Sequence, residues 1–127
     1  MAYMKFYLCK HCGNIITFAT DAGVPVLCCG EKMQPIAPNS TEAAGEKHVP
    51  VVKTQGNTVM VDVGSVRHPM EDKHHIGWIC LETSAGYQMQ YLAHDAPPVA
   101  IFALPAEEKP LRAYAYCNLH GLWECAV

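Results

Sequence analysis

The sequence Cys117-Asn118-Leu119-His120-Gly121 places a thiol and an imidazole three residues apart near the end of the 127-residue chain. It lies between two short segments, 111–116 and 122–125, that read as β-strands. Similar segments recur upstream, separated by turns rich in Gly, Pro, Asn and Asp, at 49–54, 58–63, 76–83, 87–93 and 99–104. Short strands at this spacing predict an immunoglobulin-like β-sandwich for the second part of the chain.

The composition excludes several classes of protein. Half of the residues are hydrophobic and the formal net charge is −3, with no basic run of the kind that binds nucleic acid. No stretch approaches the roughly 18 apolar residues of a membrane span, and the N-terminus does not read as a secretory signal. We therefore expect a cytoplasmic protein. The seven cysteines then favour metal ligation over disulfides.

Four of these cysteines lie before residue 30, as Cys9-x-x-Cys12 and Cys28-Cys29. Each pair is followed by Gly, which accepts the positive φ of a tight metal-binding turn. The spacing predicts a tetrahedral site with four cysteine ligands between short strands at 5–8, 14–18 and 24–27, and leaves zinc and iron both open. Adjacent residues of a strand point to opposite sides, so the chain must bend at Cys28-Cys29. A disulfide or an unligated pair is the alternative, and His11 is expected to be exposed.

Residues 36–45 contain Pro, Ser, Gly and small side chains without periodicity, which is typical of a linker. We place the domain boundary there, giving a metal-binding domain at 1–37 and the sandwich at 38–127. No segment shows the periodicity of an amphipathic helix, so the predicted fold class is all-β.

A second set of potential metal ligands lies at or near the predicted strand ends: His48, His68, His74, Cys117 and His120. Four imidazoles and a thiolate exceed the needs of a structural zinc site. They suit an iron centre with imidazoles in a plane, a thiolate on one axis and an open position opposite. His74 is preferred to His75 because strand alternation places it on one face with Ile76, Trp78 and Cys80. His94 is expected in solvent, and Cys80 and Cys125 are expected to pack as apolar residues, with a role as a ligand left as the alternative for Cys125.

Glu46 and Lys47 directly precede His48. They are either an exposed charge pair on a loop or a functional pair above the open position. In the functional interpretation Lys47 attracts an anionic substrate, and Glu46 occupies the vacant position when the iron is oxidised.

These residues resemble one known family in combination. The motifs are Cys9-x-x-Cys12, Cys28-Cys29, Glu46-Lys47-His48-Val49-Pro50, His68-Pro69-Met70-x-x-Lys73-His74 and Cys117-Asn118-Leu119-His120-Gly121-Leu122-Trp123. Together they resemble desulfoferrodoxin, the two-iron superoxide reductase, over essentially the whole chain. The resemblance implies a desulforedoxin-like domain with an iron centre held by four cysteines, Cys9, Cys12, Cys28 and Cys29. It also implies a catalytic iron with four equatorial histidines, His48, His68, His74 and His120, and Cys117 as its axial ligand.

The resemblance further implies one-electron reduction of superoxide to hydrogen peroxide, with Lys47 guiding the substrate and Glu46 capping ferric iron. It implies a cytoplasmic homodimer re-reduced by a rubredoxin-type donor. His75 departs from the family, in which an aromatic residue such as Tyr is common at this position. Two other function classes stay open: a pure electron carrier, and a zinc module with a non-catalytic sandwich. The first iron either relays electrons or stabilises its domain.

Overall fold

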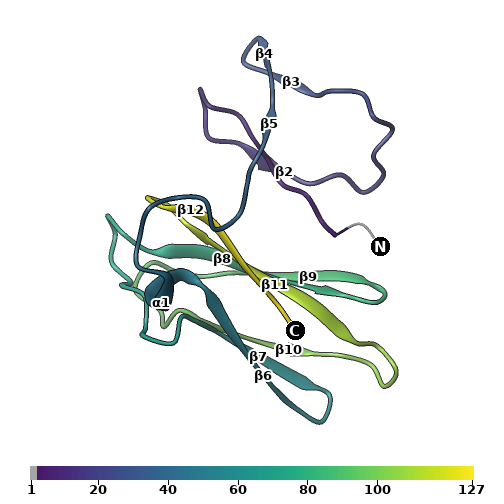
Figure 1. Ribbon diagram of the computed structural model, residues 1–127, viewed down its shortest axis with the longest axis vertical. Helices are drawn as coiled ribbons and strands as arrows, with labels where there is room; N and C mark the ends of the chain where they lie inside the picture. The colour runs from purple at the N-terminus through teal and green to yellow at the C-terminus, as the bar shows by residue number, and fades with distance from the viewer. Residues whose placement is uncertain (1–2) are drawn as a thin grey trace. The chain divides into compact units, whose positions relative to one another are not determined.

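The computed structural model describes residues 3–127, which form two compact units, one ending at Ala37 and the other spanning Pro38–Val127 (Figure 1). Strands dominate both units, which confirms the predicted all-β class. No helix in the described part of the chain is long and apolar enough to cross a membrane.

The first unit consists of two-residue strands joined by turns. β1 (Tyr7–Leu8) pairs with β2 (Ile15–Ile16) and β5 (Gln34–Pro35), and β3 (Leu27–Cys28) pairs with β4 (Glu31–Lys32), all antiparallel. Its buried apolar residues are Phe6, Cys9 and Met33. A core this small is below what normally holds a domain of about 40 residues together without a metal or a disulfide.

The second unit is a sandwich of two antiparallel sheets. One has the order β10-β7-β6 and the other β12-β11-β8-β9. The strands are β6 (Pro50–Gln55), β7 (Thr58–Val63), β8 (Ile76–Thr83), β9 (Gly86–Tyr91), β10 (Val99–Ala103), β11 (Pro110–Cys117) and β12 (Gly121–Ala126). Seven antiparallel strands in two facing sheets have the architecture of an immunoglobulin-like sandwich, as predicted.

The core of the sandwich is built by alternation on facing strands. Val59, Val61 and Val63 of β7 all point inward, as their period-2 spacing predicted, and meet Ile79 and Leu81 of β8. Each of these side chains is at most 2% exposed. Full burial of an aliphatic side chain of this size stabilises the fold by roughly 1.5–3 kcal/mol.

The register of β8 changes at Gly77. Tyr116 pairs with Trp78, whereas the next residue, Cys117, pairs with Ile76, so one residue of β8 is bulged out. Ile76 therefore enters the core together with Ile79 and Leu81. The expected common face for Ile76, Trp78 and Cys80 is thus wrong, because the bulge reverses the alternation. Cys80 is fully buried, but it lies on the opposite face of the sheet from the core.

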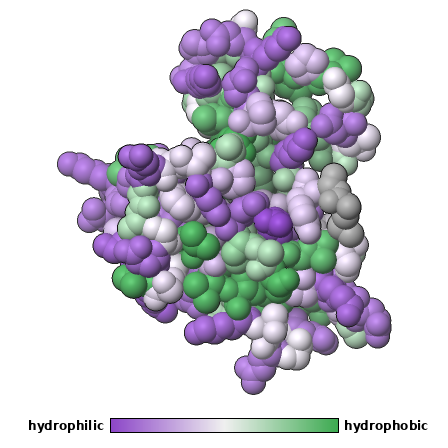
Figure 2. Space-filling model, viewed as in Figure 1, coloured by the Kyte–Doolittle hydropathy of each residue, from purple (hydrophilic) through white to green (hydrophobic). Residues whose placement is uncertain are grey.

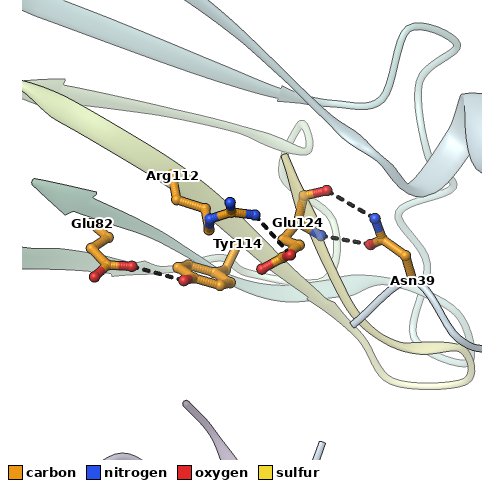
Figure 3. A network of polar contacts seen from close by, with 5 residues as sticks. All are labelled: Asn39, Glu82, Arg112, Tyr114 and Glu124. Carbon is orange, nitrogen blue, oxygen red and sulfur yellow. Dashed lines mark hydrogen bonds and ion pairs between the residues drawn. The ribbon is translucent and has the colours of Figure 1, made fainter. Parts of the chain in front are cut away.

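The segment before the sandwich is more ordered than a linker. The side chain of Asn39 accepts a hydrogen bond from the Glu124 N–H (2.8 Å) and donates one to the Glu124 carbonyl (3.1 Å), as Figure 3 shows. A single helical turn, α1 (Gly45–His48), follows. No sequence pattern indicated this helix, because four residues are too few to show a 3.6-residue period.

Polar side chains are paired on the face of β8, β11 and β12 that lies away from the core. Arg112 donates to the Glu124 carboxylate at 2.8 Å, and the Tyr114 hydroxyl donates to the carboxylate of the buried Glu82, also at 2.8 Å (Figure 3). Burial raises the pKa of Tyr114, and the hydrogen bond to Glu82 adds to this shift. The Arg112–Glu124 ion pair stabilises the pairing of β11 with β12.

Both units also expose large apolar side chains. Figure 2 shows a broad hydrophobic area on one side of the second unit, bordered by hydrophilic residues. The most exposed large hydrophobic side chains of this unit include Tyr91 (81%) and Ile101 (58%), and those of the first unit include Val24 and Leu27. Contiguous apolar surface is a common mark of protein interfaces.

Candidate metal centres

The first candidate centre is a cluster of four sulfur atoms. The Sγ atoms of Cys9, Cys12, Cys28 and Cys29 all lie within 4.8 Å of one another. The structure thus brings together all four residues of the predicted four-cysteine site. None of the seven cysteines, all within the described chain, forms a disulfide. His11 is exposed beside Glu31 and stays outside the cluster, as expected.

The local backbone explains how two adjacent cysteines reach one point. Gly13 and Gly30, which follow the two pairs, have φ values of +82° and +80°. Cys29 itself has φ of +51°, the bend that its adjacency to Cys28 required. Turns of this kind aim backbone N–H groups at the sulfurs, and the Cys12 N–H lowers the pKa of Cys9 to about 6.

Neighbouring cysteines raise the pKa of Cys28 and of Cys29. Hydrogen bonding to the sulfurs of Cys9 and Cys12 raises the pKa of Cys29 to about 12. The first thiolate thus opposes ionisation of its neighbours. A bound cation reverses this balance by stabilising all four thiolates together. The donor set therefore fits a thiophilic metal such as iron or zinc.

The second candidate centre lies at one end of the sandwich. His48 ends α1 just before β6, and His74 lies two residues before the start of β8. Cys117 is the last residue of β11, and His120 directly precedes β12. Donor atoms of these four residues lie within 4.8 Å of one another. Antiparallel neighbours start and stop at a common edge, which is why these termini converge.

His68, from the loop after β7, joins this group through His48. The two Nε2 atoms are 3.2 Å apart. His48 Nδ1 donates to the Ala44 carbonyl (2.8 Å), and His68 Nδ1 donates to the Pro69 carbonyl (2.7 Å). These bonds fix the proton on Nδ1 in both neutral rings, so two lone pairs face each other at Nε2. A cation between or beside the rings would stabilise such an arrangement.

Protonation of the histidine rings does not supply this positive charge near pH 7. Burial lowers the pKa of His68 to about 4, and burial is also the main cause that lowers the pKa of His48 and His74. The rings are therefore neutral near pH 7, which is the state that ligates metal. Burial raises the pKa of the Cys117 thiol, while the N–H groups of Leu119 and His120 favour its thiolate.

One atom in this cluster has no partner in the described chain. His74 Nε2 is buried without a hydrogen bond, a costly state for a polar atom. Nearby, His120 Nδ1 lies 3.2 Å from His48 Nε2 and 3.8 Å from the Cys117 sulfur. The orphaned nitrogen and the facing lone pairs show that the residues fit a metal ion. Imidazoles with one thiolate suit iron, copper or zinc.

Glu46 and Lys47 lie in α1, next to His48, and both side chains are exposed. Burial is the main cause of the lowered pKa of His48 and His74, and the Lys47 charge makes a smaller contribution in the same direction. The Glu46 carbonyl accepts hydrogen bonds from the Val66 N–H (2.8 Å) and the Ser65 hydroxyl (3.2 Å). The loop between β7 and His68 thus anchors this turn.

Sequence reasoning gave no role to two residues that contact the cluster. The Trp123 ring packs against His48 (centroids 4.8 Å apart), and its Nε1 donates to the His120 carbonyl at 3.1 Å. Asn118 hydrogen-bonds the backbone around His74. Both residues belong to the Cys117–Trp123 motif, but their contacts depend on tertiary structure. Cys125 packs against the sandwich core, as expected, and His94 is exposed.

Comparisons with known proteins agree with this geometry. The Desulfoferrodoxin family profile matches residues 40–126. A desulfoferrodoxin of Syntrophotalea carbinolica is 42% identical over 120 residues, which is 94% of each chain. The crystal structure of the superoxide reductase from Treponema pallidum superposes with a TM-score of 0.83 at 40% identity, covering 98% of this chain and 99% of that one. A one-iron superoxide reductase from Giardia intestinalis is 41% identical and matches 65% of this chain and 97% of its own, with a TM-score of 0.57.

Proposed function

The chain belongs to the desulfoferrodoxin family, and we propose that it is a superoxide reductase. In this reaction superoxide takes up one electron and two protons to give hydrogen peroxide, and no oxygen is released. The observation that carries the proposal is the convergence of four imidazoles and a buried thiol at one end of the sandwich, with His74 Nε2 left without a partner.

We assign His48, His68, His74, His120 and Cys117 as ligands of the catalytic iron. Bound ferrous iron supplies the electron, and a thiolate ligand raises the electron density at the metal. The Nδ1 hydrogen bonds of His48 and His68 hold both rings with Nε2 directed into the cluster. Second-shell bonds of this kind fix the tautomer and raise the basicity of the ligand.

Lys47 draws the superoxide anion to the site. The chain carries a net charge of −3, but encounter rates follow the local field rather than the net charge. The effect of Lys47 on the pKa of His48 and His74 supports its proximity to the reacting position. Its ammonium group also orders water that can deliver protons to the product. Glu46, its neighbour, provides a carboxylate that caps the site in the oxidised enzyme.

Cys9, Cys12, Cys28 and Cys29 hold the first iron, in the 1–37 domain. The small core of this unit supports a structural contribution from the metal, and a thiolate-bound iron is also able to relay electrons. A rubredoxin-type protein is the proposed electron donor.

Seven cysteines without disulfides favour the reducing cytoplasm. The apolar surface in Figure 2 supports a homodimer, which sedimentation analysis of the iron-loaded chain tests directly.

Rapid mixing tests the activity. The iron-loaded chain, reduced and kept anaerobic, is mixed with superoxide while peroxide and oxygen are measured. We expect one peroxide for each superoxide consumed, and no oxygen. Release of oxygen would identify dismutation instead. Failure to consume superoxide would favour a pure electron carrier, and the zinc-loaded chain is the control for metal-independent loss.

A visible absorption spectrum tests the metal. Ferric iron bound to thiolates absorbs visible light, whereas zinc sites are colourless. We expect bands from both centres that change when a reductant is added. A colourless chain that carries zinc after expression in iron-replete medium would support a non-catalytic zinc module.

A further inference from the structure

Asn118 lies between Cys117 and His120 and reaches across to a different segment of the chain. Its Oδ1 accepts a hydrogen bond from the His75 N–H at 2.9 Å, and its Nδ2 donates to the Lys73 carbonyl at 3.0 Å. Its own backbone N–H donates to the His75 carbonyl at 3.2 Å. Three hydrogen bonds therefore connect one residue of the β11–β12 turn to the residues on either side of His74.

The two side-chain bonds act on the two peptide groups that flank His74. The Lys73 carbonyl belongs to the peptide bond before His74, and the His75 N–H belongs to the peptide bond after it. Holding both groups restricts φ and ψ at His74 and hence the direction of its imidazole. Nε2 of His74 is the orphaned nitrogen left for the metal, and no protein hydrogen bond in the described part of the chain holds its Nδ1, where a second-shell bond would form. His48 and His68, in contrast, each have an Nδ1 bond to a backbone carbonyl.

We propose that Asn118 is a positioning residue for His74. Its amide substitutes for the missing ring hydrogen bond by fixing the backbone, and it links His74 to Cys117 and His120 on one rigid turn. The proposal rests on the proposed second metal site, not on the reaction performed there.

The chemistry at this position selects an amide. One partner is a carbonyl, which needs a donor, and the other is an N–H, which needs an acceptor. Asn offers both within one short side chain, and only one of its two flipped orientations satisfies both partners. Aspartate keeps the acceptor but places an oxygen against the Lys73 carbonyl, and alanine removes both bonds.

Metal release from the full-length, iron-loaded chain tests this role without superoxide. We expect Asn118→Asp and Asn118→Ala to release the second-site iron to a chelator about 10- to 100-fold faster, because losing a second-shell partner lowers metal affinity by about this factor. The absorption band of the Cys117 thiolate–iron pair should also shift. Iron in the four-cysteine centre should leave at its normal rate. Asn57→Asp, which makes the same charge change in the β6–β7 turn, is the matched control.

A double-mutant cycle separates positioning of His74 from a general effect on folding. In a His74→Ala background, Asn118→Asp should accelerate release by no more than about twofold, because the two changes remove the same contribution. The proposal is wrong if the double variant releases iron at a rate equal to the product of the two single-variant fold-changes. It is also wrong if either Asn118 variant releases iron at the wild-type rate.

Amide exchange in the wild-type chain provides a test that does not depend on a variant folding. In the zinc-loaded protein, which is diamagnetic, the His75 amide proton and the Asn118 side-chain amide protons should exchange slowly. The Asn57 side-chain amide is the exposed reference. Equal exchange at Asn118 and Asn57 would overturn the proposal.

Discussion

Lys47 is an exposed cation whose charge acts on two histidines of the cluster. We predict that Lys47→Ala slows the second-order reaction with superoxide about tenfold, because a focused positive field raises the encounter rate of an anion. The dependence of the rate on ionic strength should flatten, since salt then has less attraction to screen. Lys53 is also exposed but lies on β6, and Lys53→Ala should have little effect on the rate. An unchanged rate in Lys47→Ala would show that Lys47 does not attract the substrate.

Gly64 is required by close packing against the turn that carries Glu46 and Lys47. A Cβ at this position would lie 2.7 Å from the Glu46 carbonyl oxygen and 2.9 Å from the Val49 carbonyl oxygen. We predict that Gly64→Ala lowers the free energy of unfolding by about 1–3 kcal/mol, as measured by urea denaturation. Gly77→Ala is the control, because its added Cβ has no neighbour within 4 Å. Equal losses in the two variants would contradict this explanation.

At the scale of elements, the bulge in β8 places Cys80 on the face opposite the core while keeping it fully buried. Burial raises the pKa of its thiol from 9.0 to about 12. The folded state therefore keeps the proton at pH values where the unfolded chain loses it. This contribution to stability is complete below pH 9 and is lost as the pH rises through 9 toward 12.

We predict that wild-type stability falls between about pH 9 and 10.5 more steeply than that of Cys80→Ala. The difference in slope should be about 1.4 kcal/mol per pH unit, the value for one proton. Urea denaturation at several pH values measures it. Val59→Ala, which also truncates a buried side chain of the sandwich, should shift the whole curve without changing its slope. Parallel curves for wild type and Cys80→Ala would show that the thiol ionises equally in both states.

The strands of the sandwich were predictable because each spans several alternations. The valines of β7 show this alternation plainly, and the structure confirms that they face the core. The bulge at Gly77 and the helical turn α1 were not predictable, because each involves too few residues to leave a periodic pattern. Both matter for the site, since α1 carries Glu46, Lys47 and His48, and the bulge sets the pairing of Ile76 with Cys117.

For the whole molecule, the two units differ in how much they depend on metal. The second has an extensive apolar core, whereas the buried apolar side chains of the first are Phe6, Cys9 and Met33. We predict that Cys9→Ser removes the first metal and makes the 1–37 unit sensitive to protease, because a domain of this size has little other stabilisation. The absorption of the second site should persist.

Cys125→Ser is the matched control, because Cys125 packs on the sandwich core and lies outside both clusters. It should keep both metals and leave the first unit resistant to protease. Resistance of a metal-free 1–37 unit would show that its fold does not depend on the metal. Slower re-reduction by an electron donor in Cys9→Ser, with normal peroxide production, would support electron relay through the first iron.

The sequence by itself determined the all-β class and the family, because alternation and motif spacing are local properties of the chain. It also identified which cysteines and histidines come together, since each motif contains two or more chemically specific residues. Only the tertiary structure decided how they are held. The facing lone pairs of His48 and His68 join residues 20 positions apart, and the Asn118 bond to Lys73 beside His74 spans 45. Contacts at that separation depend on sheet register and strand ends, which a local pattern does not record.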